Sequence, residues 1–262
     1  MIITGLASVT FRGHGVDEIV TLAAQARLGV IEWAADVHVR PGDLAAAEHA
    51  RTQCTDHGIA IGTYGSYHKA GEDDPRQFDV LVGTAVALGA PRVRVWAGTH
   101  GSAEVSTAER RHITDALRRC ADLAGDRGVR LTVEHHVQSL TDTLDSALRL
   151  YTDLGSGAVA VHWQPRELPD IGECRTEVRA LLPELASVHA FSWGSDGFTE
   201  RLPLGARADL WQAILAELAA DEVQRHVSLE FVRDDSPAAL AEDAHQLHHW
   251  LNELENTCAP NP

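Results

Sequence analysis

Eight short runs of β-branched or apolar residues recur along the chain, and segments with the apolar spacing of helices lie between them. Their starts are 28 to 40 residues apart, the length of one strand–helix unit. The runs lie at residues 2–4, 30–33, 59–61, 93–96, 131–134, 159–161, 187–189 and 227–231. This repeat predicts an α/β fold, a single-domain (β/α)₈ TIM barrel over residues 1–262.

Helix starts and glycine patterns support the barrel over an open, doubly wound sheet. The expected helices begin at capping residues: Asp43, Ser106 with Glu109 three residues on, Thr141, and Ser236 ahead of Pro237. Neither Gly13-His14-Gly15 nor Gly155-Ser156-Gly157 continues to the third glycine of a dinucleotide-binding loop. Both are therefore interpreted as turns.

Charge and cysteine content exclude several classes of protein. The 22 Lys and Arg residues against 38 Asp and Glu residues give a net charge of −16, the wrong sign for a nucleic-acid surface. Residues 1–12 place no basic segment ahead of an apolar run, and no apolar stretch approaches the roughly 20 residues of a membrane span. The four cysteines form no C-x-x-C pair. We expect a cytoplasmic protein with reduced cysteines, acting on neither membrane nor nucleic acid, and a homo-oligomer stays open.

Polar residues gather at the carboxyl ends of the last four strands, where the active sites of such barrels lie. These residues are Glu134, His162, Gln164, His189 and Glu230. Because strand side chains alternate, an inward Glu134 implies inward Thr132 and His136. The same alternation turns Arg94 and Trp96 inward in the strand at 93–96.

Inward carboxylates in a barrel interior need a positive partner, because an unpaired buried charge is costly. Glu134, Gln164, His189 and Glu230 together offer three oxygens and one nitrogen, a set that suits Mn²⁺, Mg²⁺ or Co²⁺ more than a structural zinc. We therefore expect one divalent metal ion, Mn²⁺ in preference to the other two. The alternative is that Arg94 and the neighbouring histidines neutralise the glutamates in a salt-bridge network.

Several motifs resemble the xylose isomerase-like barrel superfamily, which contains ketose 3-epimerases, inosose dehydratases and hydroxypyruvate isomerases. The motifs are Gly29–Trp33 leading to Asp36–His38, Tyr64–Tyr67, Arg94–Trp96, Trp163–Pro165 and Leu229–Val232. They are similar to a subgroup described as sugar phosphate isomerase/epimerase, and the resemblance covers nearly the whole chain.

The resemblance implies a metal held by Glu, Asp, His and Glu on strands five to eight, at the positions of Glu134, Gln164, His189 and Glu230 here. Gln164 departs from the family aspartate. Leu140 and Glu167 stand near places where family epimerases carry polar substrate-binding residues. The loop Arg201–Gly205 resembles the arginine loop that grips substrate in these enzymes.

The expected substrate is a neutral carbohydrate, bound by Arg94, Trp96, His136 and Arg201. Asp234 and Asp235 follow the last strand, where barrels of this type usually bind phosphate, and two carboxylates there disfavour a phosphorylated substrate. Glu134 and Glu230 are the expected catalytic base and acid, and His68 at the barrel rim is a further candidate acid or base.

The predicted activity is that of a metal-dependent sugar isomerase/epimerase, which abstracts a proton next to the carbonyl of a neutral sugar or keto-sugar. One alternative is a metal-dependent dehydratase or lyase that acts by β-elimination on an inosose or 3-keto-glycoside; another is a non-catalytic sugar-sensing barrel. A class I aldolase would need Lys69, the single lysine, as its Schiff-base amine. An endonuclease IV-like enzyme would need a basic groove, which the charge of −16 opposes.

Overall fold

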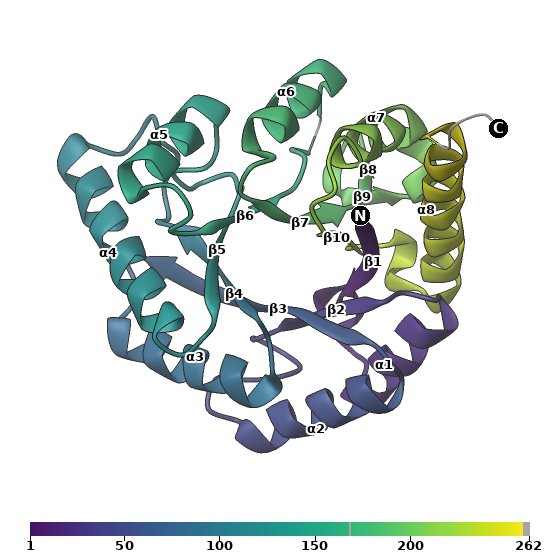
Figure 1. Ribbon diagram of the computed structural model, residues 1–262, viewed down its shortest axis with the longest axis horizontal. Coiled ribbons are helices and arrows are strands. Elements are labelled where there is room, and N and C mark those ends of the chain that lie inside the picture. The colour runs from purple at the N-terminus through teal and green to yellow at the C-terminus, as the bar shows by residue number, and fades with distance from the viewer. Residues whose placement is uncertain (168, 259–262) are drawn as a thin grey trace.

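Eight parallel strands close into a barrel in the computed structural model, which describes residues 1–167 and 169–258 (Figure 1). Residues 259–262 of the expected domain lie outside the described residues. Around the barrel the strands follow the order β1-β10-β7-β6-β5-β4-β3-β2. They are β1 (Ile2–Ala7), β2 (Val30–Ala34), β3 (Ala60–Ala70), β4 (Arg92–Ala97), β5 (Arg130–Glu134), β6 (Ala160–Trp163), β7 (Leu185–Ala190) and β10 (Arg225–Leu229). All eight expected strands and the predicted fold class are confirmed.

In the described part of the chain, eight α-helices form a ring outside the barrel (Figure 1). They are α1 (Val16–Gln25), α2 (Leu44–Asp56), α3 (Pro75–Leu88), α4 (Thr107–Gly125), α5 (Leu144–Leu154), α6 (Ile171–Leu181), α7 (Ala208–Leu218) and α8 (Pro237–Cys258). The outward strand residues Trp33, Val95 and Trp163 are fully buried against these helices, as the alternation predicts. Their partners in the alternation, Glu32, Arg94 and His162, point into the barrel.

The helix caps are confirmed at three of the expected positions and wrong at one. Ser236 accepts a hydrogen bond from the backbone N–H of Ala239 in the first turn of α8, which begins at Pro237. Asp43 accepts a hydrogen bond from the backbone of α2, and Ser106 with Glu109 forms a capping box on α4. Thr141 does not cap α5, which instead begins after Thr143. The Thr141 hydroxyl donates to the backbone carbonyl of Glu134 at 2.6 Å, so it fixes the loop that leaves the site.

A small antiparallel hairpin that the strand pattern did not predict follows β7. It consists of β8 (Ser192–Gly194) and β9 (Gly197–Leu202). The turn between them consists of Ser195 and Asp196, and Gly197, the first residue of β9, has φ +63, a backbone conformation that glycine adopts without strain. The Asp-Gly dipeptide is the signal in the sequence that could have located this hairpin.

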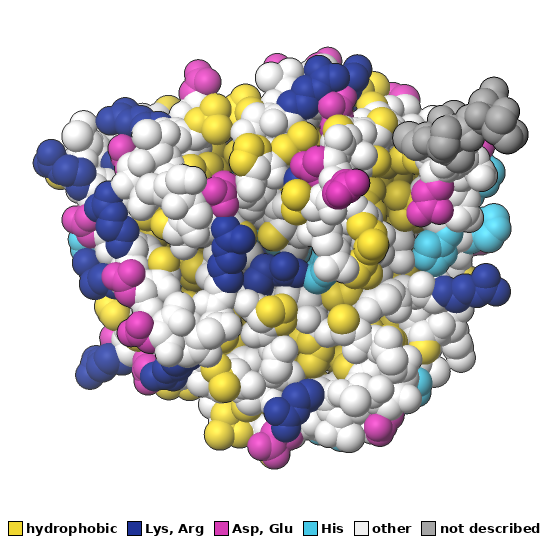
Figure 2. Space-filling view, in the orientation of Figure 1, with side chains coloured by type: hydrophobic (Ala, Val, Ile, Leu, Met, Phe, Trp, Pro, Cys, Tyr) yellow, Lys and Arg dark blue, Asp and Glu magenta, His cyan; other side chains and the backbone are white. Residues whose placement is uncertain are grey.

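The face of the molecule seen in Figure 2 mixes acidic and basic side chains, with a small basic group near the barrel axis. In the part of the chain that the structure describes, no helix is both long and apolar enough to cross a membrane.

Candidate active site

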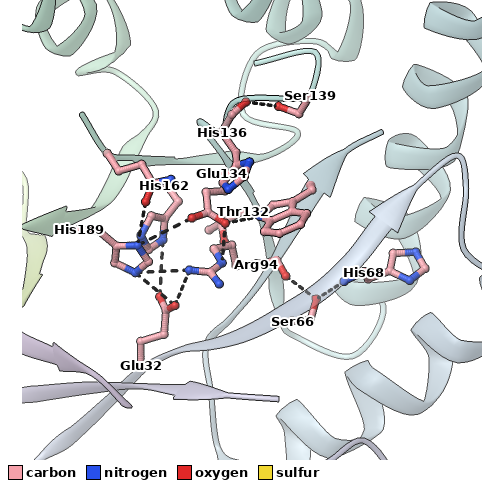
Figure 3. Close-up of polar contacts among 12 residues, drawn as sticks. Glu32, Ser66, His68, Arg94, Thr132, Glu134, His136, Ser139, His162 and His189 are labelled. Atoms are coloured by element: carbon pink, nitrogen blue, oxygen red, sulfur yellow. Dashed lines mark hydrogen bonds and ion pairs between the residues drawn. The ribbon is translucent and has the colours of Figure 1, made fainter. Parts of the chain in front are cut away.

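A cluster of polar, mostly ionisable side chains lies in the barrel interior and comes from six different strands or strand ends. Its members are Glu32 on β2, Arg94 on β4, Glu134 at the end of β5, His162 on β6, His189 on β7, and Gln164 and Glu230 just beyond β6 and β10. Figure 3 labels five of its members, Glu32, Arg94, Glu134, His162 and His189. The three carboxylates are almost inaccessible, with exposed fractions of 6% for Glu32, 3% for Glu134 and 5% for Glu230. At this depth, each charge requires a compensating partner.

Arg94 provides that partner on one side of the cluster. Its Nη1 donates to Glu32 Oε1 at 2.7 Å, and its Nε lies 3.1 Å from Glu134 Oε2. The Trp96 indole also donates to Glu134 Oε2. The salt-bridge network expected as the alternative to a metal therefore exists for Glu32 and for one oxygen of Glu134.

These contacts set the protonation of Arg94 and Glu32. Burial disfavours the charged guanidinium, but the Glu134 and Glu32 carboxylates outweigh burial and raise the pKa of Arg94. Burial likewise acts to raise the pKa of Glu32, and Arg94 together with the two histidines outweighs it and holds that pKa below its usual range. Glu32 and Arg94 form a buried ion pair.

His189 divides the cluster into two sides. Its Nε2 lies 3.3 Å from Glu32 Oε1, on the side of Arg94. Its Nδ1 lies 3.3 Å from Glu230 Oε2, 3.4 Å from Gln164 Oε1 and 3.8 Å from Glu134 Oε1. Of the four expected ligands, Glu134, Gln164 and Glu230 therefore each place an oxygen within 3.8 Å of the fourth, at His189 Nδ1.

The Nδ1 side of His189 lacks a full neutralising charge. Burial raises the pKa of Glu230 to about 7, although His189 and Arg94 act against this increase. Burial lowers the pKa of His189, and the Glu230 and Glu32 carboxylates more than offset burial, so this pKa lies above its ordinary value. His162 is different: burial and the adjacent His189 hold its pKa well below the ordinary value, so its ring is neutral.

The donors on the Nδ1 side are of the types that bind a divalent cation, although among the described residues Glu134, His189 and Glu230 do not form a group whose ligand atoms all lie within 4.8 Å of one another. Three carboxylates and one guanidinium leave a formal charge of −2 in the cluster when both histidines are neutral, and a dipositive ion cancels it. Glu134 Oε2 is occupied by Arg94 and Trp96, while Oε1 faces His189. With a proton on His189 Nε2, toward Glu32, the Nδ1 lone pair would be available to a metal, as in sites where a carboxylate lies behind a ligating histidine.

A second group of ligand atoms overlaps with this one. Glu32, His162 and His189 each offer an atom within 4.8 Å of the others. Neither ring nitrogen of His162 has a hydrogen-bond partner, which is unusual for a side chain that is 1% exposed. However, Arg94 already donates to Glu32, and its Nη1 lies 3.4 Å from His189 Nε2. A guanidinium at this distance repels a cation on the Nε2 side.

A cavity of about 490 Å³ opens beside the cluster and is lined in part by Gln164, His136 and Arg201. His136 stacks on Trp96 with ring centroids 4.4 Å apart, so these two expected substrate-binding residues lie together, and His136 lines the cavity. Arg201 on β9 is paired with Asp235 and lies over the Phe231 ring. The fourth expected substrate residue, Arg94, lies deeper, between Glu32 and Glu134.

His68 is not brought into the cluster. Its ring points away from the barrel axis, on the far side of β3 from Arg94 (Figure 3). It lies 3.7 Å from Asp73, 3.9 Å from the Cys120 sulfur and against Phe78. Burial lowers its pKa, with Asp73 acting in the opposite direction. The structure therefore gives no support to His68 as an acid or base in this site.

Glu32 and His162 belong to the cluster, but neither is among the metal-binding, catalytic or substrate-binding residues expected from the sequence. The signal for both was the alternation, since Trp33 and Trp163 point outward and their neighbours must point inward. Lys69, the residue required by the aldolase alternative, lies with Nζ 5.6 Å from the Trp96 ring centroid.

Comparison with known proteins gives the family. Residues 20–254 match the family described as xylose isomerase-like TIM barrel, so the chain belongs to that family and the expected resemblance is confirmed. A comparison with proteins of curated function finds no match.

Solved structures with the same fold include enzymes of more than one kind. The probable 3-DHS dehydratase AsbF of Bacillus anthracis superposes with a TM-score of 0.81 at 19% identity, over 95% of this chain and 99% of that chain. An L-ribulose 3-epimerase gives 0.72 at 18% identity over the whole of both chains. The IolI protein, solved with a zinc atom, gives 0.72 at 14% identity over 99% of this chain and 100% of that one. At these identities the similarity shows the fold.

Proposed function

We propose that the protein is a divalent-metal-dependent sugar isomerase or epimerase that moves a proton next to a carbonyl. The observation that carries the proposal is the convergence of Glu134, Gln164 and Glu230 oxygens on His189 Nδ1 within 3.8 Å. These four side chains would hold the ion, with Mn²⁺ the preferred metal for this oxygen-rich set. When bound, such an ion acts as a Lewis acid on a substrate oxygen.

The two glutamates are suited to different parts of the proton transfer. Glu134 is held in one orientation by Arg94 and Trp96 on Oε2, and its Oε1 is turned toward His189. Oε1 is therefore the oxygen free to act as a base. Burial raises the pKa of Glu230 to about 7, a value suited to returning a proton near neutral pH. Glu134 and Glu230 would therefore act as base and acid.

The cavity beside the cluster favours a neutral substrate. Its two arginines are both paired, Arg201 with Asp235 and Arg166 with Glu177 at 2.9 Å. A phosphate group there would compete with a carboxylate for each guanidinium. This supports a neutral sugar or keto-sugar.

A metal-dependent dehydratase or lyase is the second candidate, because the same base and acid would also serve a β-elimination. The high structural similarity to a probable dehydratase is the observation that favours it. In an elimination, Glu230 would protonate the leaving group. Detection of an unsaturated product would replace the first proposal with this one.

The test is hydrogen exchange in D₂O. Protein supplied with Mn²⁺ is incubated with a panel of ketoses, inososes and 3-keto-glycosides, and carbon-bound proton loss is followed by NMR. At least one substrate should exchange a proton, and Glu134→Gln and Glu230→Gln should each abolish the exchange. Glu222→Gln, which removes an exposed carboxylate outside the site, should leave it unchanged.

Exchange that survives both substitutions would contradict the proposal. Exchange with no panel member while the metal is bound would favour a non-catalytic sugar-sensing barrel. A cytoplasmic location stays a prediction, and the oligomeric state stays open.

A further inference from the structure

Four aromatic rings form a connected group on one side of the cavity. Trp193 stacks on Phe191 with centroids 4.1 Å apart and lies 6.3 Å from Phe198 and 6.2 Å from Phe231. The chain has only five phenylalanines, and three of them belong to this group. Trp193, Phe198 and Phe231 line the 490 Å³ cavity. The cavity therefore has an aromatic wall.

Two apolar side chains that line the cavity are exposed. Phe198 on the β8–β9 hairpin is 56% exposed, and Val137 in the loop after β5 is 48% exposed. Both line the cavity. Exposed apolar groups that line one cavity indicate a binding surface more than isolated exposed residues do.

The loop after β10 holds Phe231 in a strained conformation. Phe231 has φ +49, which is rare for a bulky residue, and Asp234 and Asp235 in the same loop also have positive φ. The Phe231 backbone N–H donates to Thr10, and its ring lies 4.8 Å from the Arg201 guanidinium carbon. Backbone strain of this kind persists mainly where function depends on the resulting geometry.

We propose that the substrate carries a flat apolar group, of aryl type, attached to its polyhydroxylated part. This inference rests on the proposed function and specifies its substrate. The polyhydroxylated part reaches Glu134 and Glu230, and the aryl group lies against Trp193, Phe198 and Phe231. Arg166 and Arg201 are already paired with carboxylates, so this wall presents rings and neutralised charges to the apolar group. An aryl glycoside or its keto-sugar derivative has this composition.

The test compares two probes that differ only in the group attached to the sugar: phenyl β-D-glucopyranoside and methyl β-D-glucopyranoside. Calorimetric titrations are performed with and without Mn²⁺. The phenyl compound should bind about tenfold more tightly in both conditions, because contact with the aromatic wall does not require the metal. Phe198→Ala should reduce the preference to less than about threefold and leave methyl glucoside affinity unchanged. Leu148→Ala, at an exposed position on α5, should retain the full preference.

Equal affinity for the two probes, no binding of the phenyl compound, or an unchanged preference in Phe198→Ala would each overturn this inference. The proposed function fails separately, through the absence of metal binding or of proton exchange. A phenyl preference without metal binding would thus support the aromatic subsite and reject the metal-dependent reaction.

Discussion

The two sides of the His189 ring face similar side chains, but the buried charge is balanced differently on each side. On the Nε2 side, Glu32 is paired with Arg94 at 2.7 Å. On the Nδ1 side, Glu230 and Gln164 face the ring at 3.3 and 3.4 Å, and Glu230 makes no arginine contact within the described residues. The paired side resembles a structural salt bridge, whereas the Nδ1 side has ligand atoms and an unbalanced charge.

This difference separates residues that form a structural ion pair from residues that could bind a metal, two roles that the sequence alone does not distinguish. The protein's own guanidinium satisfies Glu32 and half of Glu134, so these contacts support the site. The Nδ1 side retains three oxygens and one nitrogen pointing inward, so it is the side at which a metal would restore neutrality. The salt-bridge and metal interpretations therefore apply to different sides of one cluster.

The largest effect is expected on the free energy of unfolding, from a substitution on the Nε2 side, where Glu32 is paired with Arg94. Arg94→Met leaves Glu32 buried without its guanidinium, so the free energy of unfolding should fall by about 3–5 kcal/mol. Urea unfolding measures this loss. The double variant Glu32→Gln/Arg94→Met, which removes both charges, should recover at least half of it. A single variant that loses less than about 1 kcal/mol would show that the pair contributes no more than a surface salt bridge.

In metal-free protein, Glu230→Gln should increase the free energy of unfolding, the opposite of the effect expected for Arg94→Met. The pKa of Glu230 is raised to about 7 from an ordinary 4.5, so this group lowers stability as pH rises through that interval, because the unfolded chain loses the proton first. At pH 8 the substitution should increase the free energy of unfolding by roughly 1–3 kcal/mol. Urea unfolding in EDTA provides the measurement, with Glu222→Gln as the exposed control. A decrease in the free energy of unfolding would contradict the inference that the charge on the Nδ1 side is unbalanced.

Metal affinity should rise with pH. Glu230, with a pKa of about 7, and His189, with a pKa above its ordinary value, must both lose protons to act as ligands. Below about pH 6.5 the affinity for Mn²⁺ should therefore increase at least tenfold per pH unit, and it should level off above pH 8. Titrations in buffers of different ionisation enthalpy would count the released protons. Affinity that does not vary between pH 6 and pH 8 would exclude Glu230 as a ligand.

Of the changes considered, Gln164→Asp should have the smallest effect, and this effect is on metal affinity and turnover. An added carboxylate on the Nδ1 side should tighten Mn²⁺ binding by about tenfold, and it should lower turnover because a more neutralised ion is a weaker Lewis acid. Calorimetry and the exchange assay measure the two effects. Weaker binding in this variant would show that Gln164 is not a ligand.

Alternation along the strands predicted most of the cluster. A period of two residues determines that Glu134 and His189 point inward once the outward residues are apolar. The same period placed Arg94 in the interior. Its pairing with Glu32 could not be predicted, because it depends on how far a long side chain reaches across the barrel between β4 and β2.

Features that depend on irregular backbone were harder to predict. The register between β3 and β4 shifts between Gly65 and Lys69, and this shift coincides with the turn of His68 away from the site. Phe231 adopts a positive φ that its sequence neighbours do not indicate. The β8–β9 hairpin, which supplies Trp193, Phe198 and Arg201, was marked only by its Asp-Gly turn.

The most direct test of the central claim is a calorimetric titration of metal-stripped protein with MnCl₂ at pH 8. We expect one ion per chain, with affinity reduced at least 100-fold by Glu134→Gln or Glu230→Gln and by less than about tenfold by His162→Asn. Absence of binding, or loss of binding in His162→Asn with retention in Glu230→Gln, would contradict the account. The second result would place the ion at Glu32, His162 and His189 instead.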